Sequence, residues 1–193
     1  MSNAVAPRLL EARTEDPDIV WNWYQFQRQI LGEERARVSA IMNNSQSVSA
    51  TLSERYLGLT ENELESLFAR QLSELDLLAI LGMLAATEGY LQSDFRGRTD
   101  LRLKDSVSQE FLKAKKRRKR TNSRVDLDQD ILDVWSKFGP IPRAKNAVSA
   151  FRSALNLRHW LAHGRYWVEK LGRDFDTQDV HVICVGLLQS LEI

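Results

Sequence analysis

The chain has 193 residues, which fits one domain, and 43% of them are hydrophobic and 27% charged, as in an ordinary globular protein. A net charge of +1 excludes a polycation, although the run KAKKRRKR at 113–120 places seven positive charges in eight residues. Four prolines and nine glycines are few, which favours helices over a turn-rich β fold.

The sequence carries a single cysteine, Cys184, so no internal disulfide can form and a reducing, cytoplasmic setting is expected. The first residues contain no apolar run of the signal-peptide type, and no segment approaches the length of a membrane span. We therefore expect no membrane association. Residues 1–16 are expected to be a flexible leader, and residues 17–193 a single helical domain.

The first half of the chain contains three segments of predicted helix. One covers about residues 18–42, after a proline, and a polar loop follows at 43–53. Thr60 and Glu63 have the spacing of a capping box, which marks the start of the next helical segment. Residues 74–95 are apolar around almost the whole circumference of a helix, which predicts a central buried helix.

The second half continues the helical pattern. Residues 105–120 begin as a helix and end in the basic run, and residues 128–138 form a short amphipathic helix. The motif GPIP at 139–142 breaks the chain, and a long helix runs over 143–163 until a glycine stops it. The last helix covers 176–192, although its VHVICV segment also fits a strand. The sequence thus predicts an all-α, multi-helix bundle.

The end of the long helix carries an unusual set of polar residues. Arg158 projects into the middle of its apolar arc, where an arginine must pair with a buried group or line a cleft. A neighbouring stripe carries further polar side chains in steps of seven, four, three and four: Lys145, Arg152, Asn156, His159 and His163. A structural interpretation is the alternative, because the macrodipole favours histidines near a helix C-terminus.

Glu88 is the expected partner of Arg158. It lies on the leucine-rich face of the predicted central helix, where a carboxylate needs a compensating charge. Arg158 is the matching uncompensated charge, and the pair would hold the guanidinium in place. If that helix face is open to solvent, Glu88 is hydrated instead.

The pattern of Arg158, four residues and then His163, with a polar residue after the arginine and His-Gly closing the helix, resembles the signature of the HEPN superfamily. The resemblance covers about residues 70–192. It implies an all-helical bundle and, as in many members, a metal-independent endoribonuclease of toxin–antitoxin, phage-defence or RNA-processing systems that works as a homodimer.

The resemblance also implies roles for individual residues. Arg158 and His163 take the catalytic positions, and His159 stands where the superfamily commonly has Asn or Asp, so we add it to the catalytic set. Some members carry a tyrosine two residues after the histidine, whereas Tyr166 comes three residues after it here. Together with Glu88, we expect Asn156 and Tyr166 to support the catalytic residues.

These residue types suit RNA cleavage without a metal or another cofactor. RNA supplies its own nucleophile, the 2′-hydroxyl, and a histidine with a pKa near neutrality serves as acid or base. An arginine stays charged and binds phosphate in a bidentate manner. Five residues of ideal helix turn Arg158 and His163 about 140° apart, so a two-fold homodimer with both helix ends at one groove is the expected assembly.

The basic run is expected to bind RNA through the phosphate backbone, with strong salt dependence and no sequence preference. We assign this role to Lys115, Lys116, Arg117 and Arg118, and also to Arg152 on the long helix. The alternative is a solvated, partly disordered loop without a binding role.

The sequence therefore predicts a homodimeric endoribonuclease of toxin or defence type, with RNA as substrate and an antitoxin or defence-system protein as a further partner. One alternative is a catalytically silent HEPN-like domain that binds nucleic acid or protein. Another is a metal site built on His159 and His163, with a third ligand such as His181 or Asp176.

Overall fold

The computed structural model describes residues 16–43, 54–140, 142–162 and 175–193. Across these ranges the chain contains six α-helices, one 3-10 turn and one π-helical turn, and no strand. The predicted all-α class is therefore confirmed. Most of the expected leader and most of the polar loop after the first helix lie outside the described residues.

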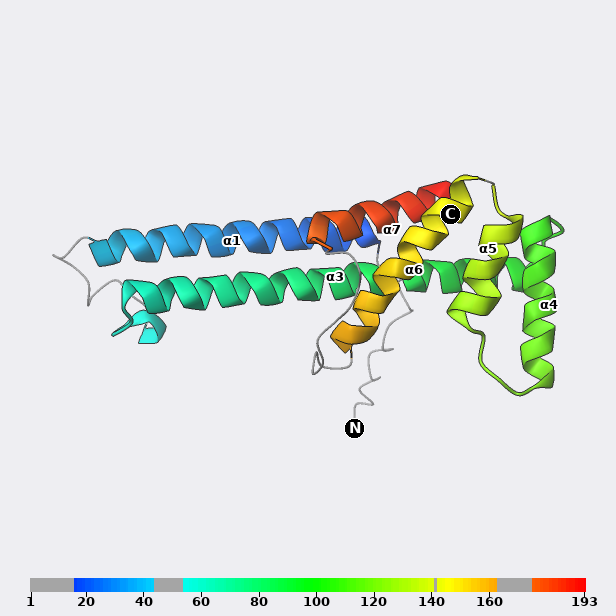
Figure 1. Ribbon diagram of the computed structural model, residues 1–193, viewed down its shortest axis with the longest axis horizontal. Coiled ribbons are helices and arrows are strands. Elements are labelled where there is room, and N and C mark those ends of the chain that lie inside the picture. The colour runs from blue at the N-terminus through cyan, green and yellow to red at the C-terminus, as the bar shows by residue number, and fades with distance from the viewer. Residues whose placement is uncertain (1–15, 44–53, 141, 163–174) are drawn as a thin grey trace, which may run out of the picture.

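The helices form an elongated arrangement with α3 as its long axis (Figure 1). α1 runs antiparallel to one half of α3, α7 lies along the other half in line with α1, and α6 crosses α3 and α7. α4 and α5 pack at the far end of α3. In chain order the elements are α1 (Pro17–Asn43), the 3-10 turn (Glu54–Tyr56), α3 (Glu61–Asp100), α4 (Ser106–Arg120), the π turn (Leu127–Leu132), α5 (Asp133–Phe138), α6 (Arg143–Ala162) and α7 (Thr177–Leu191).

Side-chain caps fix where several of these helices begin. The predicted capping box is present, because the backbone N–H of Glu63 donates to Thr60 Oγ1 at 3.3 Å and the N–H of Thr60 donates to the Glu63 carboxylate at 2.8 Å. Asp105 and Asp176 accept hydrogen bonds from the backbone N–H groups three residues on, at the starts of α4 and α7.

The predicted central helix at 74–95 lies inside α3, whose 40 residues extend it in both directions. At 1.5 Å per residue such a helix spans about 60 Å. Its middle contributes to a core that also takes residues from α4 to α7. The largest fully buried side chains of this core are Met83, Leu84, Leu91, Phe111, Ile131, Leu132, Phe151, Leu187 and Leu191.

Three local predictions are resolved by the structure. The basic run is helical through Arg120 rather than a disordered loop, and the VHVICV segment is part of α7 rather than a strand. The GPIP break is present at the end of α5, where a Cβ on Gly139 would lie 2.5 Å from the carbonyl oxygen of Trp135. Only glycine fits this close approach, and Pro140 directly after it does not continue the helix.

α1 is attached to the rest of the molecule at both ends. Near its C-terminal end, Val38 joins Tyr56, Leu64 and Phe68 in a small separate core. Near its N-terminal end, the ring of Trp21 stacks on the ring of His181 from α7, with centroids 4.5 Å apart. His181 Nε2 also lies 2.7 Å from the carboxylate of Asp18. The first and last helices of the described chain are therefore in direct contact.

Candidate functional site at the end of α6

α6 is held by its apolar side and presents polar groups near its C-terminal end. Phe151 and Ala154 are fully buried and Leu157 nearly so, as the predicted apolar arc requires. His159 and Asn156 are exposed. Arg158 lies between these two environments, with 38% of its side chain exposed.

The predicted pairing of Arg158 with Glu88 is present. Nη2 of Arg158 lies 3.1 Å from Oε2 of Glu88, whose side chain is 25% exposed. The pair joins α6 to the middle of α3, beside the main core. Because both groups are partly shielded from water, their attraction is stronger than that of a fully exposed pair. It holds the guanidinium in one place relative to α3.

The guanidinium of Arg158 also has a polar atom without a partner. Its Nε is buried and makes no hydrogen bond within the described part of the chain. A buried N–H without an acceptor costs free energy, and anionic oxygens are strong acceptors for it. Arg158 is therefore held by one carboxylate while its Nε keeps an unused donor.

Two of the predicted site residues cannot be placed against Arg158. His163 and Tyr166 lie outside the described residues, as does the glycine that follows the histidine. The structure thus brings Arg158 and Glu88 together and places Asn156 and His159 on the exposed side of the same helix. The arrangement of the complete signature stays a prediction.

Arg152 is engaged in the fold rather than directed toward solvent. Its Nε donates to the Asp128 carboxylate and its Nη2 to the Asp133 carboxylate, each at 2.5 Å. The hydrogen bond from Arg152 is the largest cause holding the pKa of Asp133 below its usual range. These contacts attach α6 to the π turn and to α5, which is a structural role that the sequence did not reveal.

The basic run is divided between structural and solvent-facing cations. Arg117 and Arg118 both bind the carboxylate of Asp130, which is fully buried, and Lys115 Nζ lies 2.6 Å from Asp100. Burial alone would raise the pKa of Asp130, but the backbone N–H of Asp126 and the two guanidinium groups lower it below its usual range. Three of the four predicted RNA-binding cations of α4 therefore have acidic partners.

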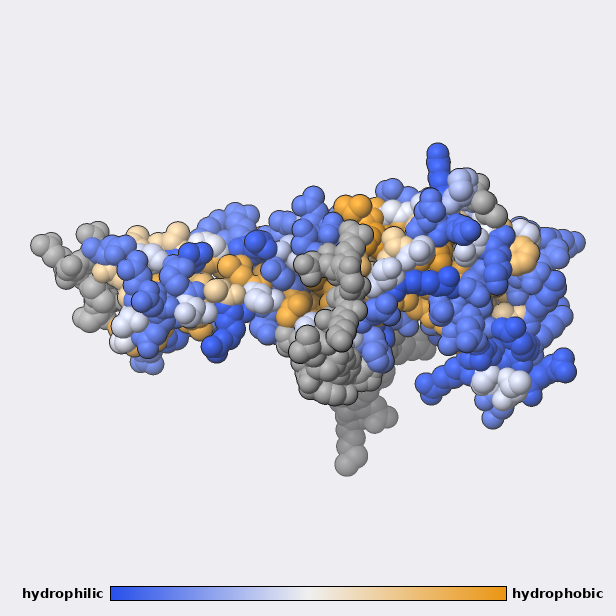
Figure 2. Space-filling model, viewed as in Figure 1, coloured by the Kyte–Doolittle hydropathy of each residue, from blue (hydrophilic) through white to orange (hydrophobic). Residues whose placement is uncertain are grey.

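Other cations of the run remain available on the surface. Lys116, Lys119 and Arg120 form no ion pair within the described residues, and all three are exposed. Lys116 and Lys119 line a cleft of about 520 Å³ where α4 meets the end of α3. Figure 2 shows this end of the molecule covered mainly by hydrophilic residues. The surface suits an anionic ligand, although fewer cations face it than the sequence indicates.

The ligands considered for a metal site lie apart. His181 is bound to Asp18 on the α1 side of α7, and the Asp176 carboxylate caps α7 by accepting the Asp179 N–H at 2.6 Å. Within the described ranges, no three His, Cys, Asp or Glu side chains are grouped closely enough to bind a metal ion. The remaining member of the suggested pair, His163, lies outside those ranges.

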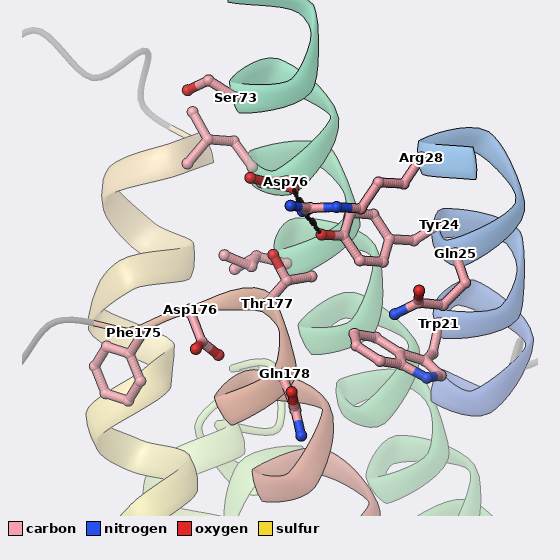
Figure 3. Close-up of a pocket in the computed structure, with 12 residues that line it drawn as sticks. Trp21, Tyr24, Gln25, Arg28, Ser73, Asp76, Phe175, Asp176, Thr177 and Gln178 are labelled. Carbon is pink, nitrogen blue, oxygen red and sulfur yellow. Dashed lines mark hydrogen bonds and ion pairs between the residues drawn. The ribbon is translucent and has the colours of Figure 1, made fainter. Parts of the chain in front are cut away.

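A cleft of about 570 Å³ opens between α1, α3 and the start of α7 (Figure 3). Arg28 and Tyr24 point from α1 toward Asp76 of α3, as the dashed contacts in Figure 3 show. The Tyr24 hydroxyl donates to Asp76 at 2.7 Å, and Arg28 lies 3.1 Å from the same carboxylate oxygen. These groups satisfy one another, so the cleft shows no uncompensated charge that would identify a ligand.

The described helices define an all-α protein with a polar helix end at α6. No described helix has the length and apolarity needed to cross a bilayer. Comparison of the chain with protein-family models, with curated proteins and with solved structures finds no match.

Proposed function

We propose that the protein is a metal-independent endoribonuclease of the HEPN-like type, with Arg158 and His163 as its catalytic residues. The observation that carries the proposal is the placement of Arg158. An arginine near the end of a long helix, fixed by Glu88 and with 38% of its side chain exposed, suits recognition of a phosphate at that helix end.

The proposed reaction uses groups that this chain and its substrate supply. His163 takes the proton from the 2′-hydroxyl of RNA or gives one to the leaving 5′-oxygen, and the equivalent group of a second copy does the other task. The 2′-oxygen forms a bond to phosphorus while the bond to the 5′-oxygen breaks, which leaves a 2′,3′-cyclic phosphate. Arg158 stabilises the charge that develops on the phosphate. His159 lies on the exposed side of α6, from which it can contact the RNA backbone.

The proposal includes a two-fold homodimer with the α6 ends near the axis, an RNA substrate, and a toxin or defence role with an accompanying partner protein. Lys116 and Lys119 would attract RNA to the α4 end, with Lys115, Arg117 and Arg118 contributing to the local potential while bound to their carboxylates. Arg152 contributes in the same indirect way.

A silent HEPN-like domain that binds nucleic acid or protein is the second candidate. It is favoured by the same ion pair, because Glu88 compensates the charge of Arg158 and reduces its attraction for a phosphate. The two candidates differ in the chemistry of the bound RNA. Catalysis changes the RNA, whereas simple binding leaves it intact.

The test is incubation of the purified full chain with total RNA beside the variants Arg158→Ala and His163→Ala. Arg143→Ala is the matched control, because this arginine is exposed at the other end of α6 and forms no ion pair within the described residues. We expect cleavage by the wild type and the control and at least a 100-fold loss in both site variants. RNA that is bound but never cleaved by the wild type would favour the silent domain.

A further inference from the structure

α1 is apolar on two faces, and only one of them is covered. Its inner face packs on the rest of the protein through residues such as Val20, Leu31 and Val38. At 100° per residue, a second set of large apolar side chains falls within about 60° of arc on another face. These residues are between 41% and 61% exposed, and we call them the outer stripe: Ile19, Trp23, Phe26 and Ile30.

The outer stripe borders a groove between α1 and α3. The groove has a volume of about 630 Å³, and Trp23, Ile30 and Leu78 line it. Leu78 is 58% exposed and adds a large apolar side chain from α3. α1 and α3 lie side by side as a two-helix arm (Figure 1). The outer stripe and Leu78 stay exposed on this arm. Exposed apolar patches of this kind mark interaction sites.

The spacing of the outer stripe indicates which kind of structure covers it, namely another helix. Its members are separated by four, three and four residues, the alternation typical of a coiled-coil seam. The order of residue types, isoleucine, aromatic, aromatic, isoleucine, reads the same in both directions. In an antiparallel pair related by a two-fold axis, residue i of one copy meets residue j of the other and j meets i, so this order sets isoleucine against isoleucine and aromatic ring against aromatic ring.

We propose that the outer stripe is a homodimer interface, in which α1 pairs antiparallel with α1 of a second copy of this chain. The two-fold axis passes between Trp23 and Phe26, so that each of these rings meets the other type in the partner copy. Ile19 then lies opposite Ile30. The flanking positions Asn22 and Gln29 carry uncharged amides, so no like charges oppose the contact beside the seam.

The exposed apolar area agrees with a dimer contact. At about 200 Å² for a large side chain, the exposed fractions of the outer stripe and Leu78 amount to roughly 500 Å² per copy. A standard interface buries about 800 Å² per partner, of which somewhat over half is apolar. The polar residues along the groove supply the remainder, and they carry both signs of charge: Glu34, Arg55, Arg70 and Glu74.

The same symmetry makes a prediction about salt. It places Asp16 of one copy opposite Glu33 of the other at each end of the seam. These like charges weaken the pairing at low ionic strength, and salt screens them. Association through the outer stripe should therefore strengthen, rather than weaken, when salt is raised. The proposal does not rest on the ribonuclease proposal, since it uses α1 and α3 and no residue near Arg158. It is a second two-fold interface, separate from the one proposed at the α6 ends.

The first test is sedimentation of the full chain and of Phe26→Glu from micromolar to roughly 100 micromolar concentration. The wild type should reach at least twice its 22.2 kDa monomer mass. Phe26→Glu should weaken association roughly 30-fold or more, because a charge would be buried in the seam. Leu101→Glu is the matched control, since Leu101 is 74% exposed at the far end of α3 and should leave the association unchanged.

The second test examines the antiparallel register by mixed disulfides. Ile19→Cys and Ile30→Cys proteins should cross-link to each other when mixed and oxidised, and neither should cross-link to itself. Cys184 does not interfere, because it is fully buried and burial raises its pKa to about 12. A monomeric wild type, an assembly insensitive to Phe26→Glu, or self-linking of Ile19→Cys alone would each overturn the proposal. A dimer lost only when α6 is altered would place the interface at the α6 end instead.

Discussion

Nη2 of Arg158 lies 3.1 Å from Oε2 of Glu88, and this ion pair joins the end of α6 to the middle of α3. Each group is a charge on an otherwise apolar helix face, and the other group supplies the compensating charge. The contact also divides the roles of the guanidinium, because Nη2 binds the carboxylate while Nε keeps an unused donor. Its energetic contribution can be measured directly.

We expect a double-mutant cycle on Glu88→Gln and Arg158→Ala to give a coupling of about 1 kcal/mol in the free energy of unfolding. Both side chains are partly exposed, so solvent reduces the interaction below that of a buried pair. Urea denaturation of the wild type, the two single variants and the double variant gives this value. Additive effects would show that the pair is not energetically coupled. Glu88→Gln should also lower the rate of RNA cleavage, because Arg158 loses its positioning partner.

His163→Ala should abolish RNA cleavage and leave the fold intact. The sequence predicts a helix-terminal position on a polar stripe for His163, where a histidine contributes little to stability, so we expect the unfolding free energy to change by no more than about 1 kcal/mol. Cleavage of a labelled RNA and thermal unfolding are measured on the same preparation. Full activity in the variant would remove His163 from the catalytic set, and a large loss of stability would assign it to the fold.

Cleavage should continue in excess chelator and should leave a 2′,3′-cyclic phosphate on the 5′ fragment. The expected nucleophile is the substrate's own 2′-hydroxyl, so DNA and RNA with a 2′-O-methyl group at the scissile position should resist. Mass spectrometry of the fragments identifies the terminal phosphate. Activity that disappears in chelator and returns with Zn²⁺ or Mg²⁺ would instead support a metal site that includes His159 and His163.

Replacing Lys116, Lys119 and Arg120 by glutamine should weaken RNA binding at all sequences and reduce its salt dependence. These three cations face solvent and form no ion pair in the described residues, so their loss should leave stability within about 0.5 kcal/mol of the wild type. Titration of RNA at several salt concentrations gives the slope. An unchanged slope would mean that the α4 surface does not contact RNA.

Asp130→Asn should destabilise the protein by about 2 to 3 kcal/mol at neutral pH, because the buried carboxylate loses its charged bonds to Arg117 and Arg118. The pKa of Asp130 is lowered in the folded state. Its contribution is therefore present above the unfolded pKa near 4 and disappears as the pH falls through the lower folded value. The difference in unfolding free energy between wild type and variant should shrink below about pH 4. A difference independent of pH would contradict this assignment.

The features that sequence reasoning predicted well are those with a local signal. Thr60 caps α3 together with a residue three positions away, so short spacing alone marks the start of that helix. The Glu88 and Arg158 pair was found from a different rule, that charges on apolar faces require partners. With two such charges on long predicted helices, few pairings between them were possible.

The features that were missed depend on contacts between distant segments. Asp130 belongs to an acidic stretch whose composition is typical of a solvated surface. It is buried beneath Arg117 and Arg118 only because the π turn packs against α4. The structural role of Arg152 was missed for the same reason, because Asp128 and Asp133 contact it only in the folded state. The sequence shows the helical spacing of the outer stripe of α1. Which of the two apolar faces of α1 stays exposed depends on where α3 and α7 pack against this helix.

The order of the helices along the chain has a consequence for how the protein reaches its fold. The buried middle of α3 is covered by α6 and α7, which begin roughly 60 and 90 residues later in the sequence. At a synthesis rate of about 5–20 residues per second, Met83, Leu84 and Leu91 wait several seconds on the ribosome before their partners emerge. Nascent chains halted before α7 should therefore be the species that chaperones and proteases select.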